Sequence, residues 1–449
     1  MSINFAFMKD INSTYYKYLD DIEKEARIKP KNAARNCRSL LERFIDDLFT
    51  KNNIPKEEEL YKNLRNLMNY SKRLGLPKIN NVEFEVVDMN NKISVKSNNG
   101  LYYVKDLANA ASHEGLPTKE DQQFVVLSSH AIIKALRVFD NLFVGYYKQR
   151  LQGKKTKFLD ANVPLGEYEI LTSYVPADTD RSKCIMEYMT SRKIGEYSKA
   201  RRNALVIEYL PNEMEKLFLN RNIDTFSDVN PYIYSDGVTV IRLNQIEEPH
   251  AHFFIAYEFA DDRPVEPLAK FLKKTSLDLK NRVDICLKIA RLMSKFHNAQ
   301  DPIYHRMLNY ESIMISDFTD RNEGYKPYIT KFDFAKITSI TEGTVYKNLT
   351  EAEAKESAKL SRYKLESVTP NSKWDKVDIY SLGVLFVDIM LNGVSTKAIT
   401  ENTFEELIDA GISDGMIDII DSMLCEIPDE RPSINQVLKA IDEESKRFE

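Results

Sequence analysis

The stretch at residues 374–393, WDKVDIYSLGVLFVDIMLNG, decides the fold of the C-terminal half of this 449-residue chain. Apolar residues cover nearly every side of a helix with this sequence, and such a helix lies inside a large domain or inside a membrane. The stretch is short for a bilayer and carries Asp378 and Asp388, which excludes the membrane interpretation. Gly393 is typical of a helix C-terminus. We therefore expect a buried helix at the axis of this half.

The composition is that of a soluble globular protein with two or three domains. Hydrophobic residues make up 43% and charged residues 29% of the chain. The net charge of -5 argues against a broad nucleic-acid footprint but leaves room for a local one. The four cysteines lie far apart without zinc-ligand spacing, which fits a reducing cytosol. Because no signal peptide or transmembrane stretch is recognised, we expect a cytoplasmic protein. Because the sequence shows no metal-ligand spacing, we expect no bound metal.

The first 147 residues are expected to form a helical domain of their own. Apolar residues fall at three- and four-residue intervals over 10–75 and again over 104–147. Between them, residues 82–104 alternate around 89–91, which predicts a short β-hairpin. Residues 148–163, KQRLQGKKTKFLDANV, read as a linker. Its basic residues form a solvated charge run or, alternatively, contact nucleic acid or an acidic partner.

Two motifs of this domain, RNCRSLLE at 35–42 and NAASH at 109–113, are similar to those of HEPN-like helical modules of bacterial proteins. Ribonucleases of that superfamily use an Arg with a His a few positions on. Here Asn109 and His113 match, but Ala108 stands at the place of the Arg, so nothing obvious stabilises developing phosphate charge. The resemblance implies binding of a partner protein or homodimerisation, with RNA cleavage by His113 as an alternative.

From Tyr168 the apolar period changes to two. Three consecutive strands are predicted over 168–175, 183–189 and 203–210, then a helix over 212–221 and two strands near 231–246 and 252–259. The rest of the chain is helical by spacing, apart from a loop-rich centre at 299–345. The expected fold class is α+β, with an all-α N-terminal domain followed by a five-stranded unit over 164–259 and a mainly helical unit over 260–449.

Two stretches carry a resemblance to protein kinases of the Ser/Thr type. Residues 378–385, DIYSLGVL, are similar to the central helix of the kinase large lobe. Residues 296–315, FHNAQDPIYHRMLNYESIMI, resemble the catalytic loop LHxxxIxHRDLxxxNIxI, with His305 and Arg306 in place. The resemblance covers residues 165–449. It implies a small lobe, a large lobe and a hinge at Glu258, Phe259 and Ala260.

In the catalytic loop, two positions that handle protons and metal differ from the kinase pattern. Met307 stands for the Asp that accepts the substrate hydroxyl proton, and a thioether is not a base. Ser312 stands for the Asn that binds the second magnesium. The turn at 175–182, VPADTDRS, contains no glycine to let the backbone approach phosphates.

The charges of two further positions are exchanged relative to the family. In LVIE at 205–208, Glu208 replaces the Lys that binds phosphates, and in ITKFDFAK at 329–336, Lys331 replaces the Asp that holds magnesium. A cation cannot ligate a cation. An alternative alignment makes Asp333 the metal ligand. At about 4 Å and an effective dielectric near 20, opposite charges attract by roughly 4 kcal/mol, so we expect Glu208 and Lys331 to approach each other across the cleft.

The scaffold positions of the family are present. Glu366 and Arg431 match an ion pair that ties the activation segment to a late helix, and Asp378 matches the acid that anchors the catalytic loop. The sequence keeps the residues that build the kinase scaffold but replaces those that handle phosphate and metal, which indicates a pseudokinase. A pseudokinase requires no cofactor, so we do not expect the chain to bind ATP with magnesium. The expected role is a regulatory or scaffolding protein, by analogy in a bacterial defence or signalling system.

Two alternatives stay open at this point. One is an active atypical kinase that uses Asp333 on the metal, with Glu311 or Asp317 near the hydroxyl group. The other is a HEPN-type ribonuclease regulated by the kinase-like domain.

Overall fold

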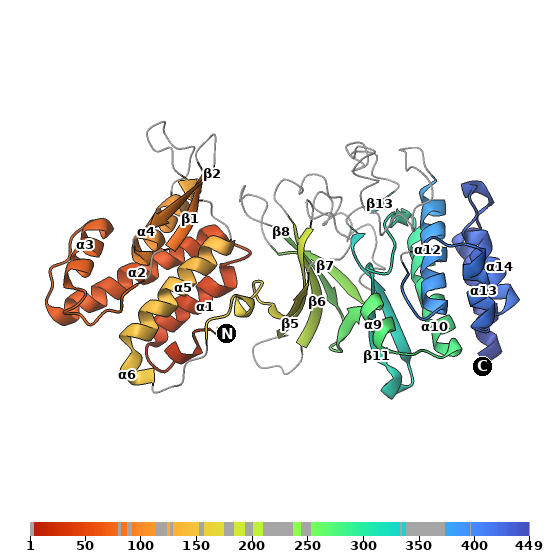
Figure 1. The fold of residues 1–449 in the computed structure, drawn as a ribbon, viewed down its shortest axis with the longest axis horizontal. Helices are drawn as coiled ribbons and strands as arrows, with labels where there is room; N and C mark the ends of the chain where they lie inside the picture. Colours follow the sequence, from red (N-terminus) through yellow and green to blue (C-terminus); the bar gives the residue numbers. More distant parts are fainter. Residues whose placement is uncertain are drawn as a thin grey trace.

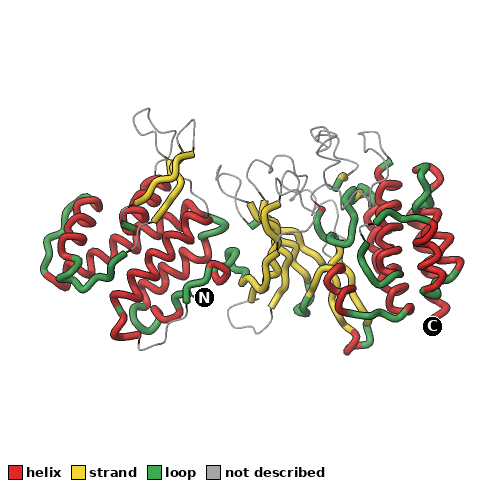
Figure 2. The backbone as a smooth tube through the Cα atoms, in the orientation of Figure 1, coloured by secondary structure: helices red, strands yellow, loops and turns green. Residues whose placement is uncertain are grey.

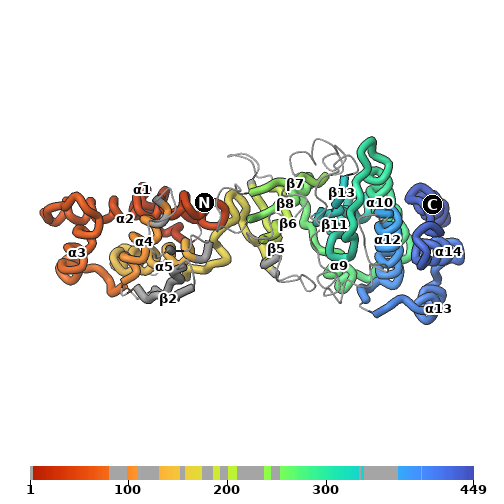
Figure 3. Tube along the Cα trace, turned by 90° about the horizontal axis from the view of Figure 1, so that it is seen from above, coloured from red at the N-terminus to blue at the C-terminus, as the bar shows by residue number. Residues whose placement is uncertain are grey.

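The computed structural model describes residues 4–79, 82–87, 92–97, 99–112, 124–125, 129–151, 157–174, 184–193, 201–209, 237–243, 253–332, 335–337, 373–395 and 397–448. Three parts follow one another along the longest axis of the molecule (Figure 1). N-terminal helices lie at one end, an antiparallel sheet in the middle and C-terminal helices at the other end, and the view from above in Figure 3 has the same order. The chain is thus a mixed α+β protein, and Figure 2 shows most of the strands gathered between the two groups of helices.

The N-terminal region is helical, as its apolar spacing predicted. Asn12 begins the first long helix by accepting hydrogen bonds from the backbone N–H groups of Thr14 and Tyr15. The core includes Tyr15, which stacks on Phe143 with ring centroids 5.5 Å apart. The helices are η1 (Ala6–Met8), α1 (Ser13–Glu25), α2 (Pro30–Asn52), α3 (Leu60–Tyr70), α4 (Gly100–Ser112), α5 (Ser129–Tyr146) and α6 (Lys148–Leu151).

The predicted hairpin is present, so this region is mainly helical rather than all-α. Strand β1 (Val82–Val87) pairs antiparallel with β2 (Lys92–Ser97), and the short β3 (Phe124–Val125) pairs with the other edge of β1. The alternation of the sequence over 82–97 accounts for the hairpin. Nothing in the apolar spacing of 120–128 indicated the third strand.

The C-terminal end of the expected linker packs against the N-terminal helices. Val163 is fully buried in their core, and its carbonyl accepts a hydrogen bond from Arg27 Nε at 3.2 Å. Asp160, in η2 (Asp160–Asn162), forms an ion pair of 2.7 Å with Arg137. The start of the segment is the helix α6. Residues 157–163 of the expected linker are therefore packed rather than free, because Phe158 and Val163 supply apolar surface that the helices bury.

The central sheet has five antiparallel strands in the order β4-β5-β6-β8-β7. Strand residues alternate between the two faces. Val206 and Ala256 face the N-terminal helices, whereas Ile207 and Tyr257 face the large C-terminal core. The helix expected over 212–221 lies outside the described residues. The strands are β4 (Glu169–Tyr174), β5 (Cys184–Lys193), β6 (Arg201–Tyr209), β7 (Val238–Arg242) and β8 (Phe253–Phe259).

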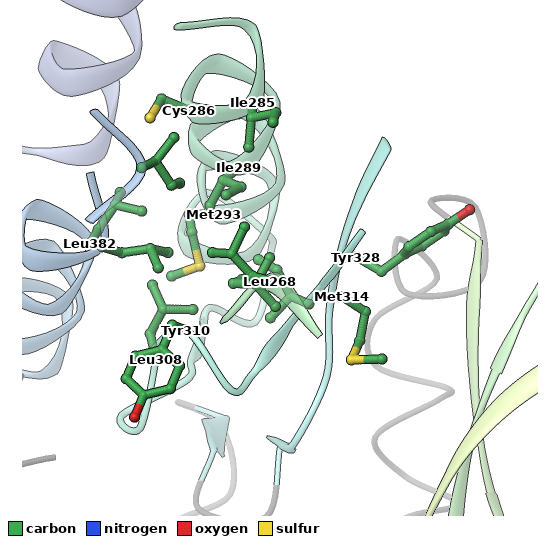
Figure 4. Close-up of a cluster of buried hydrophobic side chains, with 14 of the residues drawn as sticks. Leu268, Ile285, Cys286, Ile289, Met293, Leu308, Tyr310, Met314, Tyr328 and Leu382 are labelled. Carbon is green, nitrogen blue, oxygen red and sulfur yellow. The ribbon is translucent and has the colours of Figure 1, made fainter. Parts of the chain in front are cut away.

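The C-terminal region packs helices around the axis that the sequence predicted. Figure 4 shows side chains of α10 meeting Leu382 of α12 and Leu308. The helices are α9 (Leu268–Lys274), α10 (Leu279–His297), η4 (Thr319–Arg321), α12 (Trp374–Met390), α13 (Glu401–Asp409), α14 (Asp414–Met423), η8 (Pro428–Glu430), α15 (Ile434–Ser445) and η9 (Lys446–Phe448). The strands are β9 (Val265–Pro267), β10 (Ile303–Tyr304), β11 (Ile313–Phe318), β12 (Gly324–Ile329) and β13 (Lys336–Ile337).

Helix α12 is buried on all sides, which confirms the first expectation. Even two of its three carboxylates are enclosed, because Asp378 is 0% and Asp388 is 1% exposed. Gly383 permits close packing with α14, since a Cβ atom added there would lie 3.0 Å from Met423 Cβ. Within the described residues, no helix has the length and apolarity needed to cross a membrane.

Candidate functional site

The loop after β10 is held in place by one buried carboxylate of α12. Asp378 accepts hydrogen bonds from the backbone N–H of His305 at 2.8 Å and of Arg306 at 2.7 Å. His297 Nε2 donates to the same carboxylate at 3.0 Å. Arg306 has a φ of 67°, a left-handed conformation that costs a non-glycine residue on the order of 1 kcal/mol or more. The carboxylate thus fixes a strained loop, the anchoring role that the sequence assigned to Asp378.

The side chains of His305 and Arg306 point into the protein rather than into solvent. His305 Nε2 donates to the carbonyl oxygen of Thr330 at 2.9 Å, and its burial lowers the pKa of the imidazole. The guanidinium of Arg306 lies 4.0 Å from the ring centroid of Trp374, the single tryptophan of the chain. Both residues therefore support the loop.

Ser312, at the position of a metal-binding Asn, is committed to its own turn. Its hydroxyl group donates to the carbonyl oxygen of Asn309 at 2.7 Å and accepts from the Asn309 N–H at 3.0 Å. The side chain is fully buried. The Asn309 side chain in turn donates to the carbonyl oxygen of Met307 at 2.8 Å. The hydroxyl is therefore used to close its own turn.

Lys331 lies between two carboxylates at the end of β12. Its Nζ is 2.5 Å from Glu187 Oε1 on β5 and 3.4 Å from Glu311 Oε2. The three side chains are 15%, 3% and 20% exposed respectively, so the pairs are largely shielded from water. Lys331 also has a left-handed φ of 61°. The ammonium group therefore joins the central sheet to the C-terminal region.

The partner of Lys331 is Glu187 rather than the expected Glu208. Glu208 accepts a hydrogen bond from the Tyr188 hydroxyl on the opposite face of the sheet. The pleat explains the difference, because Glu187 lies opposite Ile207 in the β5–β6 register and shares its face. A one-residue difference in strand register moves a side chain to the other face. The sequence signal for Glu187 was present as a lone carboxylate inside the apolar run of β5.

The residue after Lys331 makes a second contact with the sheet. The backbone N–H of Phe332 donates to the hydroxyl group of Tyr257 on β8 at 3.0 Å. Tyr257 and Phe332 are both fully buried. Residues 331 and 332 therefore connect the C-terminal region to two different strands. Asp333, the alternative metal ligand, lies outside the described residues.

The expected hinge is the end of strand β8, and its Glu258 faces away from the cleft. Glu258 accepts hydrogen bonds from Arg192 and from the Tyr168 hydroxyl at 2.7 Å, and it lies 3.3 Å from Arg202. Phe259 is buried in the large core, and the N–H of Ala260 donates to the carbonyl of Gly237. Burial alone would raise the pKa of Glu258, but the hydrogen bonds from Arg192 and Tyr168 overcome it and lower the pKa.

The lowered pKa of Glu258 predicts an acid-dependent loss of stability. The contribution is complete above the ordinary pKa of 4.5 and is lost as the pH falls through the lower folded value. We expect the difference in melting temperature between the natural chain and Glu258→Gln to shrink as the pH falls below 4.5. Thermal unfolding measured between pH 6 and pH 3, at about unit intervals, checks this. Glu405→Gln, at an exposed position of α13, is the control; an equal pH trend in both variants would contradict the prediction.

The remaining candidates from the sequence are the N-terminal motif residues Asn109 and His113 and the expected ion pair of Glu366 with Arg431. Asn109 on α4 accepts a hydrogen bond from Arg38 of α2 at 3.2 Å, whereas His113 lies outside the described residues. Glu366 also lies outside them. Its expected partner Arg431 is 2% exposed and donates to the carbonyl oxygens of Cys425 at 2.8 Å and Lys376 at 2.9 Å.

Comparison with known proteins identifies the class of the C-terminal part. Residues 234–441 match the family model described as protein kinase domain. The chain thus contains a protein-kinase-like domain over these residues. The match begins after β4, β5 and β6, and we call the five-stranded sheet the small lobe and the C-terminal helical region the large lobe. No curated protein was found to match the chain.

The residues around Lys331 do not fit a magnesium ion at this position. Magnesium requires oxygen ligands, but this position presents an ammonium group, and the Ser312 hydroxyl is used within its turn. Among the described residues, no group of three or more His, Cys, Asp or Glu side chains is placed to hold a metal ion.

Proposed function

We propose that the kinase-like domain is a pseudokinase and that the protein acts as a regulator or scaffold rather than as a phosphotransferase. The observation that carries the proposal is the position of Lys331 between Glu187 and Glu311. In a kinase of ordinary chemistry, this position supplies the carboxylate that holds magnesium against the phosphates. Here it supplies a positive charge already committed to two glutamates.

The charges of the cleft support the same conclusion for the nucleotide. Glu187 and Glu311 bring two carboxylates to the place where a triphosphate would lie in the family, and these carry the same sign of charge as the phosphates. Like charges in a shielded site repel strongly. Met307 adds no base for an acceptor hydroxyl group. We therefore propose that ATP with magnesium is not a cofactor of this protein.

The N-terminal helical region is proposed to bind another protein, with a homodimer as the alternative form of the same role. A regulator that has no reaction of its own must act through binding. The helical region has a hydrophobic core distinct from that of the kinase-like domain. It can therefore present a separate surface to a partner. We propose a cytoplasmic site of action.

The test combines nucleotide binding with phosphoryl transfer. For the full chain we expect no magnesium-dependent rise in melting temperature with ATP and no transfer of labelled γ-phosphate to itself or to a general protein substrate. Asp333→Asn tests the alternative of an active kinase, and Asp418→Asn, at an exposed position of α14, is the control. Label transfer that Asp333→Asn abolishes and Asp418→Asn preserves would overturn the proposal.

A further inference from the structure

The turn between α1 and α2 is docked on the face of the central sheet that is turned away from the cleft. Arg27 places its guanidinium 5.8 Å from the ring centroid of Tyr188 on β5. Ile28 packs against the apolar cluster of that face, which includes Tyr168 and Tyr188. In Figure 1 the sheet accordingly stands between the N-terminal helices and the large lobe.

Ile28 packs beside Gly166, whose backbone conformation favours glycine. A Cβ atom added at Gly166 would lie 2.8 Å from Ile28 Cδ1, and Gly166 has a φ of 66° that L side chains rarely adopt. Arg27 also donates to the carbonyl oxygens of Asp160 and Val163, which precede β4. The turn therefore lies in fixed contact with the sheet rather than at the end of a free tether.

Strand β5 connects this contact to the cleft through two neighbouring residues. Tyr188 faces Arg27 and donates its hydroxyl to Glu208, while Glu187 faces the large lobe and pairs with Lys331. The side chains point to opposite faces because they are consecutive in a strand. Both are buried, so a shift of the strand displaces both contacts together.

From this geometry we infer that the N-terminal helical region controls closure of the kinase-like cleft, with β5 as the coupling element between the Arg27–Ile28 turn and the Glu187–Lys331 pair. A partner that binds the helical region and moves this turn thereby loosens the pair. The inference rests on the proposed function, because it describes how a binding protein would regulate its cleft. It requires that the Glu187–Lys331 pair exist in a formed and a broken arrangement, and that the position of the Arg27–Ile28 turn change the balance between them.

The amide of Phe332 gives a direct readout of the closed state. Its N–H is bonded to Tyr257 across the two lobes, next to Lys331. Hydrogen exchange of this amide, measured on the full chain, therefore reports separation of the lobes. Lys331→Met breaks the pair from the cleft side, and Ile28→Ala weakens the docking from the other side of the sheet. Arg27→Lys, which keeps the charge, is a second and milder change at the turn.

We expect Ile28→Ala to speed exchange of the Phe332 amide roughly five-fold, and Arg27→Lys to act in the same direction. In a chain that already carries Lys331→Met, the same changes should have much less effect, because the pair they act on is gone. Ile408→Ala, at a 60% exposed position of α13, is the matched control and should change nothing. Unchanged exchange with Ile28→Ala, or equal effects with and without Lys331→Met, would overturn the inference. Label transfer from ATP would overturn the proposed function while leaving this exchange result standing.

Discussion

Replacing Asp378 by alanine is expected to lower the free energy of unfolding of the large lobe by about 3–5 kcal/mol. The carboxylate is fully buried and accepts from two backbone N–H groups and from His297. Alanine removes the acceptors of all three hydrogen bonds, and each buried donor left without an acceptor costs roughly 1–3 kcal/mol. The left-handed backbone of Arg306 loses its support at the same time. The melting temperature of this lobe should fall by roughly 10 °C or more in calorimetry.

Asp375→Ala is the matched control for this change. Asp375 is an aspartate on the same helix, in its first turn and partly exposed, so we expect a loss below about 1 kcal/mol. Asp378→Asn should fall between the two, because an amide keeps one acceptor oxygen and turns a donor toward the loop. If Asp378→Ala destabilises no more than Asp375→Ala, the carboxylate is not what holds the loop.

The sequence predicted the parts of the fold in which one physical signal dominates. The helix at 374–390 is apolar all round, and only burial satisfies that pattern. Asp378 was recognised from its place in the kinase pattern, and a carboxylate inside an apolar helix requires a buried set of donors. The hairpin over 82–97 followed from alternation alone.

The cleft was predicted less completely because strand register is weakly specified where both faces are buried. All seven described positions from Asn203 to Tyr209 in β6 are buried, so apolar character does not tell which side chains face the large lobe. Glu208 and Glu187 both interrupt apolar strands, and the sequence cannot say which of them meets Lys331. The third strand beside the hairpin and the packed end of the linker depend on contacts distant in sequence, which local spacing does not encode.

Removing the charge of Lys331 is expected to destabilise the contact between the lobes by about 2–4 kcal/mol, since breaking a shielded ion pair leaves the remaining charge poorly compensated. In Lys331→Met, Glu187 keeps a carboxylate that is 3% exposed and loses the ammonium group 2.5 Å away. The measurement is chemical denaturation of the full chain, followed by hydrogen exchange to assign the transition to the lobes.

A second change identifies the charge as the cause of this loss. Glu187→Gln in the Lys331→Met chain removes the uncompensated carboxylate, so most of the lost stability should return, and the two changes should be strongly non-additive. Glu169→Gln is the control, because Glu169 is 39% exposed on β4 and pairs with Arg201 rather than with Lys331. Recovery with Glu187→Gln but not with Glu169→Gln means that Lys331 serves as an internal counter-ion between the lobes. Additive losses would mean instead that Lys331 contributes through its aliphatic stem, and the electrostatic argument against magnesium at this position would lose its basis.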